Sequence, residues 1–453
     1  MPDTPKSDPQ GSRGLRVPSG RLTRMARLGG LTAGVAGNMA AGGLASLGRG
    51  ERPSMRGLLL TPRNITRVAD ELAKMRGAAM KMGQLLSMDT GDVLPPELSQ
   101  IMARLRDDGH IMPPKQLKRV LEAAWGDGWL RRFKRFDVRP IAAASIGQVH
   151  RAQTRDGRDV AVKVQYPGVA GSIDSDVANV GALIKLTGLL PKGFELAPYL
   201  EEARQQLHIE TDYAAEARSL QRFGDLLAGD GRFVVPGFHC DLSGPDILTM
   251  DFIDSRPIED AVAEDQPTRG RIAADLIDLM LAELFDFGLM QTDPNFANYR
   301  YKPDTGQIVL LDFGATRVLS AEVADQYRRI MRAGLDGDRA GLVACAHEIG
   351  FLSPDVAARH ADQITDMMEV VFGALTAQPH FDFADPALNR QMQAKGMALA
   401  EDGFVPPPLP VDALFLQRKF AGIFLLAARL QARAPVVEML EHWISPSRSR
   451  PAP

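Results

Sequence analysis

The segment between residues 148 and 164 constrains the fold of this chain most strongly. Two stretches in which apolar and polar residues alternate, Gln148–Thr154 and Arg158–Val164, flank the tripeptide Arg155-Asp156-Gly157. An Asp-Gly pair between two such stretches is a strong signal for a β-hairpin, because its turn needs residues that accept a positive φ. The sequence therefore predicts an antiparallel sheet in a chain whose other patterns are mostly helical.

Helical patterns lie on both sides of this sheet. Apolar residues recur at steps of three and four from Ile65 to Met88, and a long helical region runs from about Ile173 to Leu227. The chain after Pro257 is largely helical and is interrupted by residues 291–314. The expected fold class is α+β with two lobes, a small lobe that carries the sheet and a larger helical lobe. Further short strands are predicted near residues 133–136, 233–238 and 246–252.

The composition is that of a globular protein. The chain has 453 residues, 45% of them hydrophobic and 24% charged, which excludes a wholly disordered chain. Its 53 basic and 56 acidic side chains give a net charge of −3, so nucleic acid is not an expected partner. The two cysteines, Cys240 and Cys345, cannot build a disulfide framework, and we expect two buried thiols in a reducing compartment. The histidines show no metal-ligand spacing and are expected to be structural.

The first fifty residues form a basic, Gly/Ala-rich tail, with seven Lys or Arg side chains against two Asp. Within it, residues 28–48 carry no charge and are long enough to cross a bilayer. Three interpretations stay open. The segment is a flexible tail, because Gly opposes helix formation, or it lies on an anionic membrane surface. Alternatively it spans the bilayer, where Gly30 and Gly34 would allow close helix packing.

Two motifs lie in the predicted sheet. Residues 142–149 read A-A-A-S-I-G-Q-V, where a protein-kinase phosphate loop reads G-x-G-x-x-G-x-V, so Ala142 and Ala144 replace the first two glycines. Val160-Ala161-Val162-Lys163 resembles the kinase V-A-I-K, whose lysine binds nucleotide phosphates and is held by a helical carboxylate. Glu216, on the following helical region, is the expected partner of Lys163. The alternative for Lys163 is a solvated surface ion pair.

Two further motifs lie in the segment that interrupts the C-terminal helices. Asp293 and Asn298 are five residues apart, which is the spacing of the catalytic aspartate and the metal-binding asparagine in H-R-D-x-x-x-x-N. Asp312-Phe313-Gly314 follows the apolar strand 308–311, and a carboxylate there would bind Mg²⁺. The gap of 19 residues from Asp293 to Asp312 predicts a short hairpin that joins the catalytic loop to the metal site. The four motifs in this order predict a kinase-like fold. Residues 315–320 lead directly into a helical pattern, so neither a long activation segment nor a platform for a protein substrate is expected.

With these motifs in place, the chain resembles the UbiB-type atypical kinases, also called aarF-domain-containing kinases. Lys81-Met82-Gly83-Gln84 matches the K-x-G-Q signature of that family, and residues 210–217 match its E-x-D-Y-x-x-E-A. The string M-Q-T-D-P-N-F-A-N at 290–298 is closest to the mitochondrial-type coenzyme Q biosynthesis branch. The resemblance extends from about residue 60 to about residue 433.

The resemblance implies roles for individual residues and a layout for the chain. Lys163, Glu216 and Asp293 would be catalytic, Asn298 and Asp312 would hold Mg²⁺, and the K-x-G-Q extension would fold over the active site. The nucleotide-binding residues would be Ala142, Ala143, Ala144, Ser145, Gly147, Val149 and Lys163. The regulatory residues would be Lys81, Gly83 and Gln84, facing Glu210 and Asp212. The expected domains are a tail (1–54), the K-x-G-Q extension (55–130), the small lobe with a helical insertion (131–253) and the large helical lobe (254–453).

The implied function is that of an atypical Mg²⁺-dependent, ATP-binding or ADP-binding kinase or ATPase. It would support ubiquinone biosynthesis at a membrane and would not phosphorylate proteins. Expected partners are a lipid surface and ubiquinone precursors or biosynthetic enzymes, and the expected place is the cytoplasmic side of an inner membrane, or the matrix side in a mitochondrion. The oligomeric state stays open, a homodimer included. The alternative is a nucleotide-gated scaffold that binds lipids or partners without phosphotransfer. A small-molecule kinase of the aminoglycoside or choline type is disfavoured by D-F-G and K-x-G-Q.

Overall fold

The computed structural model describes residues 76–89, 111–187, 196–353, 356, 358–404, 407 and 409–445. The chain divides into two compact units. The first unit contains Met1–Arg218 and Gly237–Phe252, and the second contains Ser219–Pro236 and Ile253–Pro453. Residues 219–236, which the sequence assigned to the small lobe, therefore belong with the second unit. The basic tail, residues 28–48, and the first part of the helix predicted at 65–88 lie outside the described residues.

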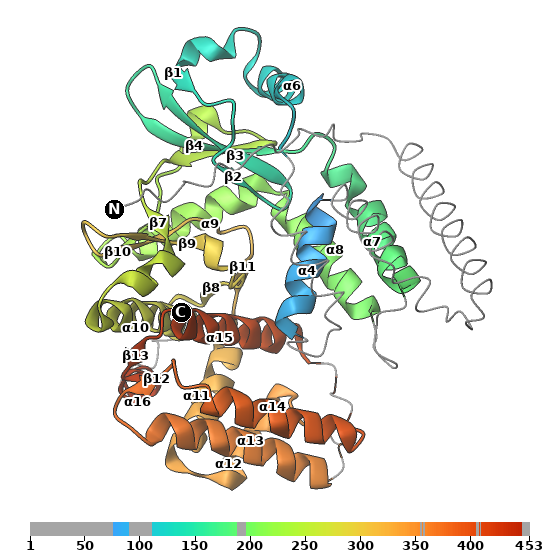
Figure 1. Cartoon of the computed structure of the whole chain (residues 1–453), viewed down its shortest axis with the longest axis vertical. Helices are drawn as coiled ribbons and strands as arrows, with labels where there is room; N and C mark the ends of the chain where they lie inside the picture. Colours follow the sequence, from blue (N-terminus) through green and yellow to red (C-terminus); the bar gives the residue numbers. More distant parts are fainter. Residues whose placement is uncertain are drawn as a thin grey trace, which may run out of the picture. The chain divides into compact units, whose positions relative to one another are not determined.

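The first unit is built on an antiparallel sheet with the strand order β1-β3-β4-β6, and β2 pairs with the free edge of β3 beside β1 (Figure 1). The predicted hairpin is confirmed, because β3 and β4 pair antiparallel from Gly147 opposite Gln165 to Gln153 opposite Asp159. Buried and less buried side chains alternate along β3, as expected of a strand with one face in a core. The strands are β1 (Phe133–Phe136), β2 (Ala142–Ala143), β3 (Gly147–Thr154), β4 (Asp159–Gln165) and β6 (Ile247–Asp251).

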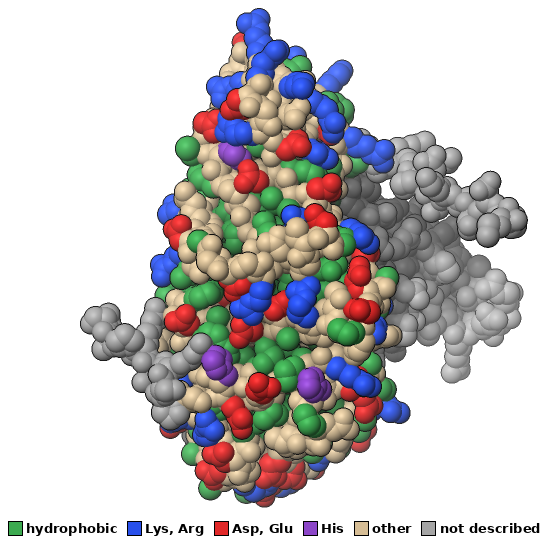
Figure 2. Space-filling view, turned by 90° about the vertical axis from the view of Figure 1, so that its left-hand side faces the viewer, with side chains coloured by type: hydrophobic (Ala, Val, Ile, Leu, Met, Phe, Trp, Pro, Cys, Tyr) green, Lys and Arg blue, Asp and Glu red, His purple; other side chains and the backbone are tan. Residues whose placement is uncertain are grey.

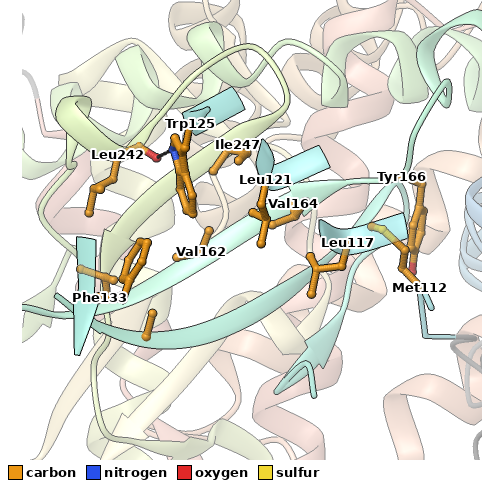
Figure 3. Close-up of a cluster of buried hydrophobic side chains, with 12 residues drawn as sticks. Met112, Leu117, Leu121, Trp125, Phe133, Val162, Val164, Tyr166, Leu242 and Ile247 are labelled. Atoms are coloured by element: carbon orange, nitrogen blue, oxygen red, sulfur yellow. Dashed lines mark hydrogen bonds between the residues drawn. The ribbon is translucent and has the colours of Figure 1, made fainter. Parts of the chain in front are cut away.

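The helix α6 (Pro114–Trp125) covers one face of this sheet and forms its core with it (Figure 3). Leu117, Leu121 and Trp125 project at helical spacing onto Val162 and other apolar residues of the strands. The indole N–H of Trp125 donates a hydrogen bond of 3.2 Å to the carbonyl of Leu242, so this large buried side chain has no unpaired donor.

The other helices of the first unit are α4 (Arg76–Asp89), α7 (Ile173–Thr187), α8 (Ala197–Glu210) and the beginning of α9 (Tyr213–Leu226). The helix α4 contacts both α7 and α8, and Figure 1 shows these three helices side by side. The helical region predicted at 173–227 is thus three separate helices, with residues 188–195 outside the described part of the chain.

The second unit combines three small sheets with a set of helices. One sheet has the order β5-β10-β9-β7, in which β9 and β10 form the predicted hairpin between Asp293 and Asp312. The strand β5 runs parallel to β10, so the strand predicted near 233–238 is confirmed but does not join the first sheet. The strands are β5 (Phe233–Val234), β7 (Arg256–Pro257), β8 (Leu289–Gln291), β9 (Tyr299–Lys302), β10 (Gln307–Leu310), β11 (Thr316–Val318), β12 (Phe381–Asp382) and β13 (Arg433–Ala434).

Among the helices of the second unit, α10 and α15 are the most deeply buried. The chain passes from β11 straight into α11, whose first turn is capped by the Ser320 hydroxyl, so the predicted absence of a long segment after Gly314 is confirmed. The described residues include no helix that is both long and apolar enough to cross a bilayer. The helices are α10 (Gln266–Ala282), α11 (Ala321–Asp336), α12 (Arg339–Ile349), α13 (Ala358–Thr376), α14 (Ala387–Glu401), α15 (Val411–Arg429) and α16 (Val436–Ile444).

Candidate functional site

The Ala-rich segment forms a short strand and a tight turn at the edge of the first sheet. Ala142 and Ala143 pair with β3, and the amide of Ala144 donates a 2.9 Å hydrogen bond to the carbonyl of Gly147. The methyl groups of Ala142 and Ala143 are exposed. They are therefore not core residues.

Gly147, the one glycine that remains of the phosphate-loop pattern, is required by the packing of the sheet. A Cβ on this residue would lie 2.4 Å from the carbonyl oxygen of Val164 on the paired strand and 3.2 Å from the hydroxyl of Tyr213. The 2.4 Å contact with the backbone is shorter than real side chains make, so any larger residue would displace β3 from β4. The glycine thus keeps Lys163, which precedes Val164, in its place beneath the turn.

Lys163 forms a buried ion pair with Glu216. Its ammonium nitrogen lies 2.8 and 2.9 Å from the two carboxylate oxygens, and the side chains of Lys163 and Glu216 are only 11% and 2% exposed. The ring of Tyr213 lies 5.3 Å from the same nitrogen. A buried pair costs far more to break than a surface pair, about 3–5 kcal/mol against at most about 1 kcal/mol. The alternative of a solvated surface pair is wrong for this lysine.

The K-x-G-Q helix contacts the Ala-rich turn through a second buried lysine. Lys81 on α4 is 3% exposed and lies 2.8 Å from Glu210 at the end of α8. The other carboxylate oxygen of Glu210 accepts a hydrogen bond from the hydroxyl of Ser145 in the turn. Close packing supports this link, because a Cβ on Gly77 would lie 2.5 Å from the carbonyl oxygen of Ser145. The extension therefore holds the turn by charge and by direct backbone contact.

The remaining residues of the two regulatory motifs are placed as follows. Gly83 is buried on α4. Gln84 belongs to the same helix, but its side chain lies outside the described part of the structure. The carboxylate of Asp212 accepts a 2.8 Å hydrogen bond from the amide of Ala215, so it satisfies an N–H group in the first turn of α9, four residues before Glu216.

The second unit brings Asp293 and Asn298 together in one loop. The side-chain amide of Asn298 donates a 3.2 Å hydrogen bond to the carbonyl of Asp293, and the Asp293 carboxylate accepts from the amide of Asn295 over 3.3 Å. Thr292 anchors the start of the loop, because its amide and its hydroxyl both donate to the carbonyl of Ala315. Asp293 is half-buried and Asn298 is buried.

Asp312 follows β10 and lies next to this loop in the hairpin. The amide of Leu311 donates a 3.0 Å hydrogen bond to the carbonyl of Asn298, which ties the residue before Asp312 to the other predicted metal ligand. The Asp312 carboxylate accepts from the amide of Gly314 over 2.9 Å. Phe313 is buried, and its ring centre lies 4.8 Å from that of Phe223, so the aromatic residue of D-F-G anchors the turn in the core of the second unit.

These side chains fit a magnesium nucleotide. Asn298 and Asp312 provide hard oxygen atoms, and the part of the chain that the structure describes contains no cluster of three or more His, Cys, Asp or Glu side chains suited to a metal. Mg²⁺ is typically held by one or two such side chains together with substrate phosphates, rather than by a cage of protein ligands. A two-ligand site therefore matches an ion that arrives with the phosphates of a nucleotide.

Two features of this site were not predicted from the sequence. The hydroxyl of Ser145 is held by Glu210, 65 residues away, and Gly77 touches the turn from a helix whose position no local pattern reveals. The small residues Gly77-Ala78-Ala79 at the start of α4 were a usable signal, because small side chains on one helix face permit a close approach of backbones.

The predictions for histidine and cysteine are confirmed in part. His150 is a buried structural residue, with a 2.8 Å hydrogen bond between its Nδ1 and the carbonyl of Asp137. Cys345 is buried as expected. The prediction that Cys240 is buried is wrong, because it begins a short 3-10 turn at the surface rather than a strand or helix of the core.

Comparison with known proteins decides the family. Residues 104–346, more than half of the chain, match the model of the ABC1 atypical kinase-like domain. The chain belongs to this family. Atypical kinase COQ8, mitochondrial, of Saccharomyces cerevisiae is 38% identical to this kinase over 92% of its chain and 83% of the yeast protein. Atypical kinase coq-8, mitochondrial, of Caenorhabditis elegans is 37% identical over 92% of this chain and 56% of the nematode protein.

A vertebrate relative and a solved structure agree with these matches. Atypical kinase COQ8B, mitochondrial, of Danio rerio is 36% identical over 92% of this chain and 67% of the fish protein. The structure of Rv3197 with erythromycin from Mycobacterium tuberculosis shares the fold, with a TM-score of 0.58 and 24% identity over 84% of this chain and 95% of that chain. The predicted UbiB/aarF family, the mitochondrial-type coenzyme Q branch, the kinase-like fold and the phosphotransferase class of enzyme are confirmed.

Proposed function

We propose that this kinase binds ATP or ADP with Mg²⁺ and hydrolyses ATP, or transfers its phosphoryl group, in support of ubiquinone biosynthesis. Lys163, oriented by Glu216, holds the phosphates in this proposal, and Asn298 and Asp312 hold the metal. Asp293 accepts the proton of the attacking hydroxyl group or water. When bound, Mg²⁺ neutralises charge on the phosphates. The Ala-rich turn, residues 142–145, covers the nucleotide in this proposal.

The observation that carries this proposal is the buried Lys163–Glu216 pair beneath the Ala-rich turn. A lysine that is removed from water at such cost is expected where its charge is used, and 11% of its side-chain surface remains exposed. The Lys81–Glu210–Ser145 link supports a regulatory role for the K-x-G-Q extension, because it ties α4 to the turn that would cover the phosphates. Movement of α4 would alter that turn directly.

An apolar cavity in the second unit supports a ubiquinone precursor as the partner. Its volume is about 410 Å³, within the range of small-molecule pockets. Its walls come from α10, α11, α13, α14, α15 and α16 and are almost entirely aliphatic, aromatic or methionine side chains, among them Met280, Met331, Phe372, Met392 and Phe424. Such a lining, in which Asn389 is the one polar side chain, favours a hydrocarbon or isoprenoid chain over a charged group.

One end of the first unit supports contact with an anionic membrane. Lys and Arg side chains gather at the top of the view in Figure 2, where the first unit carries β1 and the turn before it. Leu130 is 57% exposed there, beside the exposed Arg131, Arg132 and Lys134. Each basic side chain near an anionic surface contributes about 1 kcal/mol of attraction. We propose peripheral association with an inner membrane on this basis.

The test is ATP hydrolysis by the purified full chain, measured with neutral vesicles, with anionic vesicles, and with anionic vesicles that contain a quinone-precursor mimic. We expect Mg²⁺-dependent phosphate release that rises with anionic lipid and rises again with the mimic. Asp293→Asn should lower it at least about 100-fold, because the proton acceptor is lost.

A nucleotide-gated scaffold without phosphotransfer is the second outcome of this experiment. It would bind nucleotide and vesicles but release no phosphate above the level of Asp293→Asn. A mimic that carries no apolar chain serves as the control for the cavity. If it stimulates hydrolysis as well as the chain-bearing mimic does, the cavity has no part in the function.

A further inference from the structure

The second unit contains a buried lysine that the kinase motifs do not use. Lys419 lies in the middle of α15, and its side chain is 2% exposed. Lysine is among the residues that are almost never fully buried unless paired. Its side chain has three contact partners, and each is at least 120 residues away in the sequence. Two of them flank the loop of Asp293 and Asn298, and the third lies in the turn that supports this loop.

The contacts of Lys419 bracket that segment. Its ammonium donates to the carbonyl of Gln291 over 2.8 Å and to the hydroxyl of Tyr299 over 3.1 Å. Gln291 precedes Asp293 by two residues, and Tyr299 directly follows Asn298. One charged group therefore holds the chain on both sides of the loop, and each of its donors meets a buried acceptor.

Glu283 completes the arrangement. Its carboxylate lies 3.0 Å from the Lys419 nitrogen, is 1% exposed, and accepts a long hydrogen bond of 3.4 Å from the amide of Gln291. Glu283 opens a single π-helical turn, Glu283–Phe287, at the end of α10, an irregularity that is frequent at functional sites. The pair thus contacts both the amide and the carbonyl of Gln291.

A second contact brings α15 against the loop itself. A Cβ on Gly422 would lie 2.1 Å from the Cβ of Pro294, the residue that follows Asp293. Gly422 is one helical turn from Lys419, so both residues lie on the face of α15 that contacts the loop. Lys419 therefore holds the residues on either side of the loop, Gln291 and Tyr299, and Gly422 on the same helix packs against Pro294 within it.

The positive charge of Lys419 is maintained in the fold. Burial alone would lower the pKa of Lys419, but the carboxylate of Glu283 and the hydroxyl of Tyr299 raise it above its ordinary value. Burial also raises the pKa of Glu283, and the ammonium of Lys419 opposes that shift. The ammonium form of Lys419 therefore persists at neutral pH, with three acceptors to hold it.

We propose that Lys419, held by Glu283, is a positioning residue that fixes the loop of Asp293 and Asn298 for turnover. It cannot reach a substrate, because its side chain is enclosed, and it acts only through Gln291 and Tyr299. The proposal rests on the proposed ATP-dependent function, since it assigns a geometric support to that function's loop. An error of about 1 Å in the place of a reacting group costs on the order of 100-fold in rate.

The experiment compares steady-state ATP hydrolysis by the full chain and three variants. Lys419→Met leaves the buried Glu283 without its partner, which strongly destabilises the fold and endangers folding. The double variant Lys419→Met with Glu283→Gln removes both charges and keeps the volume, so its stability should be close to that of the wild type. Arg329→Met with Glu348→Gln removes a more exposed pair between α11 and α12 in the same unit and serves as the matched control.

We expect the double variant to melt near the wild-type temperature, to bind Mg·ADP as tightly, and to show a kcat lowered about 10- to 100-fold with an unchanged KM for ATP. The control should match the wild type throughout. A folded double variant with wild-type kcat overturns the proposal. If the wild type itself hydrolyses no more ATP than Asp293→Asn, the proposed function fails instead, and the two failures are distinguished within one series.

Discussion

Two of the buried lysine–glutamate pairs in the described part of this kinase, Lys163–Glu216 and Lys419–Glu283, differ in the other groups that contact the lysine. Lys163 in the first unit meets both oxygens of Glu216, lies over the ring of Tyr213 and is 11% exposed. Lys419 in the second unit is 2% exposed and donates to the backbone carbonyl of Gln291 and to Tyr299 as well as to its glutamate. The first lysine side chain keeps a small exposed fraction, whereas the second is enclosed by the chain.

This difference separates two uses of the same costly interaction. A charge that remains accessible in a low-dielectric setting is suited to an anionic ligand, because its attraction is screened little by water. A charge enclosed by backbone and side-chain acceptors cannot bind a ligand, but it fixes the atoms around it. The comparison predicts that loss of the first pair affects nucleotide affinity, and that loss of the second affects turnover.

The largest expected effect in this comparison is on nucleotide affinity. Lys163→Met with Glu216→Gln should weaken the binding of Mg·ADP about 10- to 100-fold, since a hydrogen bond to a charged group contributes about 1.5–3 kcal/mol. Calorimetric titration measures this directly. The double variant of Lys419 and Glu283 is the matched control and should bind Mg·ADP like the wild type. Equal losses of affinity in both double variants would break the distinction between an accessible and an enclosed lysine.

A smaller effect concerns the response of the first unit to pH. Gln148 donates its side-chain N–H to Nε2 of His150, and its carbonyl oxygen accepts from the amide of Met112, so the ring is held as an acceptor at that nitrogen. Burial lowers the pKa of His150, although the contacts with Asp137 oppose this shift. The unfolded chain therefore takes up a proton below about pH 6.5 that the folded chain does not, and stability falls as the pH falls.

The free energy of unfolding of the first unit should thus fall by up to about 1.4 kcal/mol per pH unit below about pH 6.5 because of His150. Urea unfolding at about pH 7.5 and about pH 5.5 in a Trp443→Phe background measures it, because Trp125 and Trp129 of the first unit then provide the fluorescence. The His150→Gln variant should show a smaller difference between the two pH values. If wild type and variant respond to pH alike, His150 has no such effect.

Local patterns predicted the parts of the fold that depend on neighbouring residues. The Asp-Gly turn indicated the hairpin of β3 and β4, and the spacing of Asp293, Asn298 and Asp312 indicated the second hairpin, because both structures form between segments close in the chain. The Lys163–Glu216 pair was predicted only because a known motif links residues 53 positions apart. Charge alone did not indicate that the pair is buried.

Contacts between distant segments left no pattern in the sequence. The strand β5 was expected near the first sheet, but it pairs with β10, 75 residues later, and two residues are too few for a register to be encoded by alternation. The contacts of Lys419 were not predicted either, because in the sequence it is one of several polar residues on an amphipathic helix. Cys240 was expected in the core because free thiols usually are, yet it lies at the surface in a turn.

The thermal stability of the full chain with nucleotide tests the central claim most directly. We measure the shift in Tm on adding ADP with and without Mg²⁺ for the wild type and for Asp312→Asn, a substitution of nearly equal size that removes one ligand charge. The wild type should gain stability in a Mg²⁺-dependent manner, since a ligand that binds only the folded state stabilises it. Asp312→Asn should lose the Mg²⁺-dependent part of the shift. Equal Mg²⁺-dependent shifts for both proteins would contradict the assignment of the site.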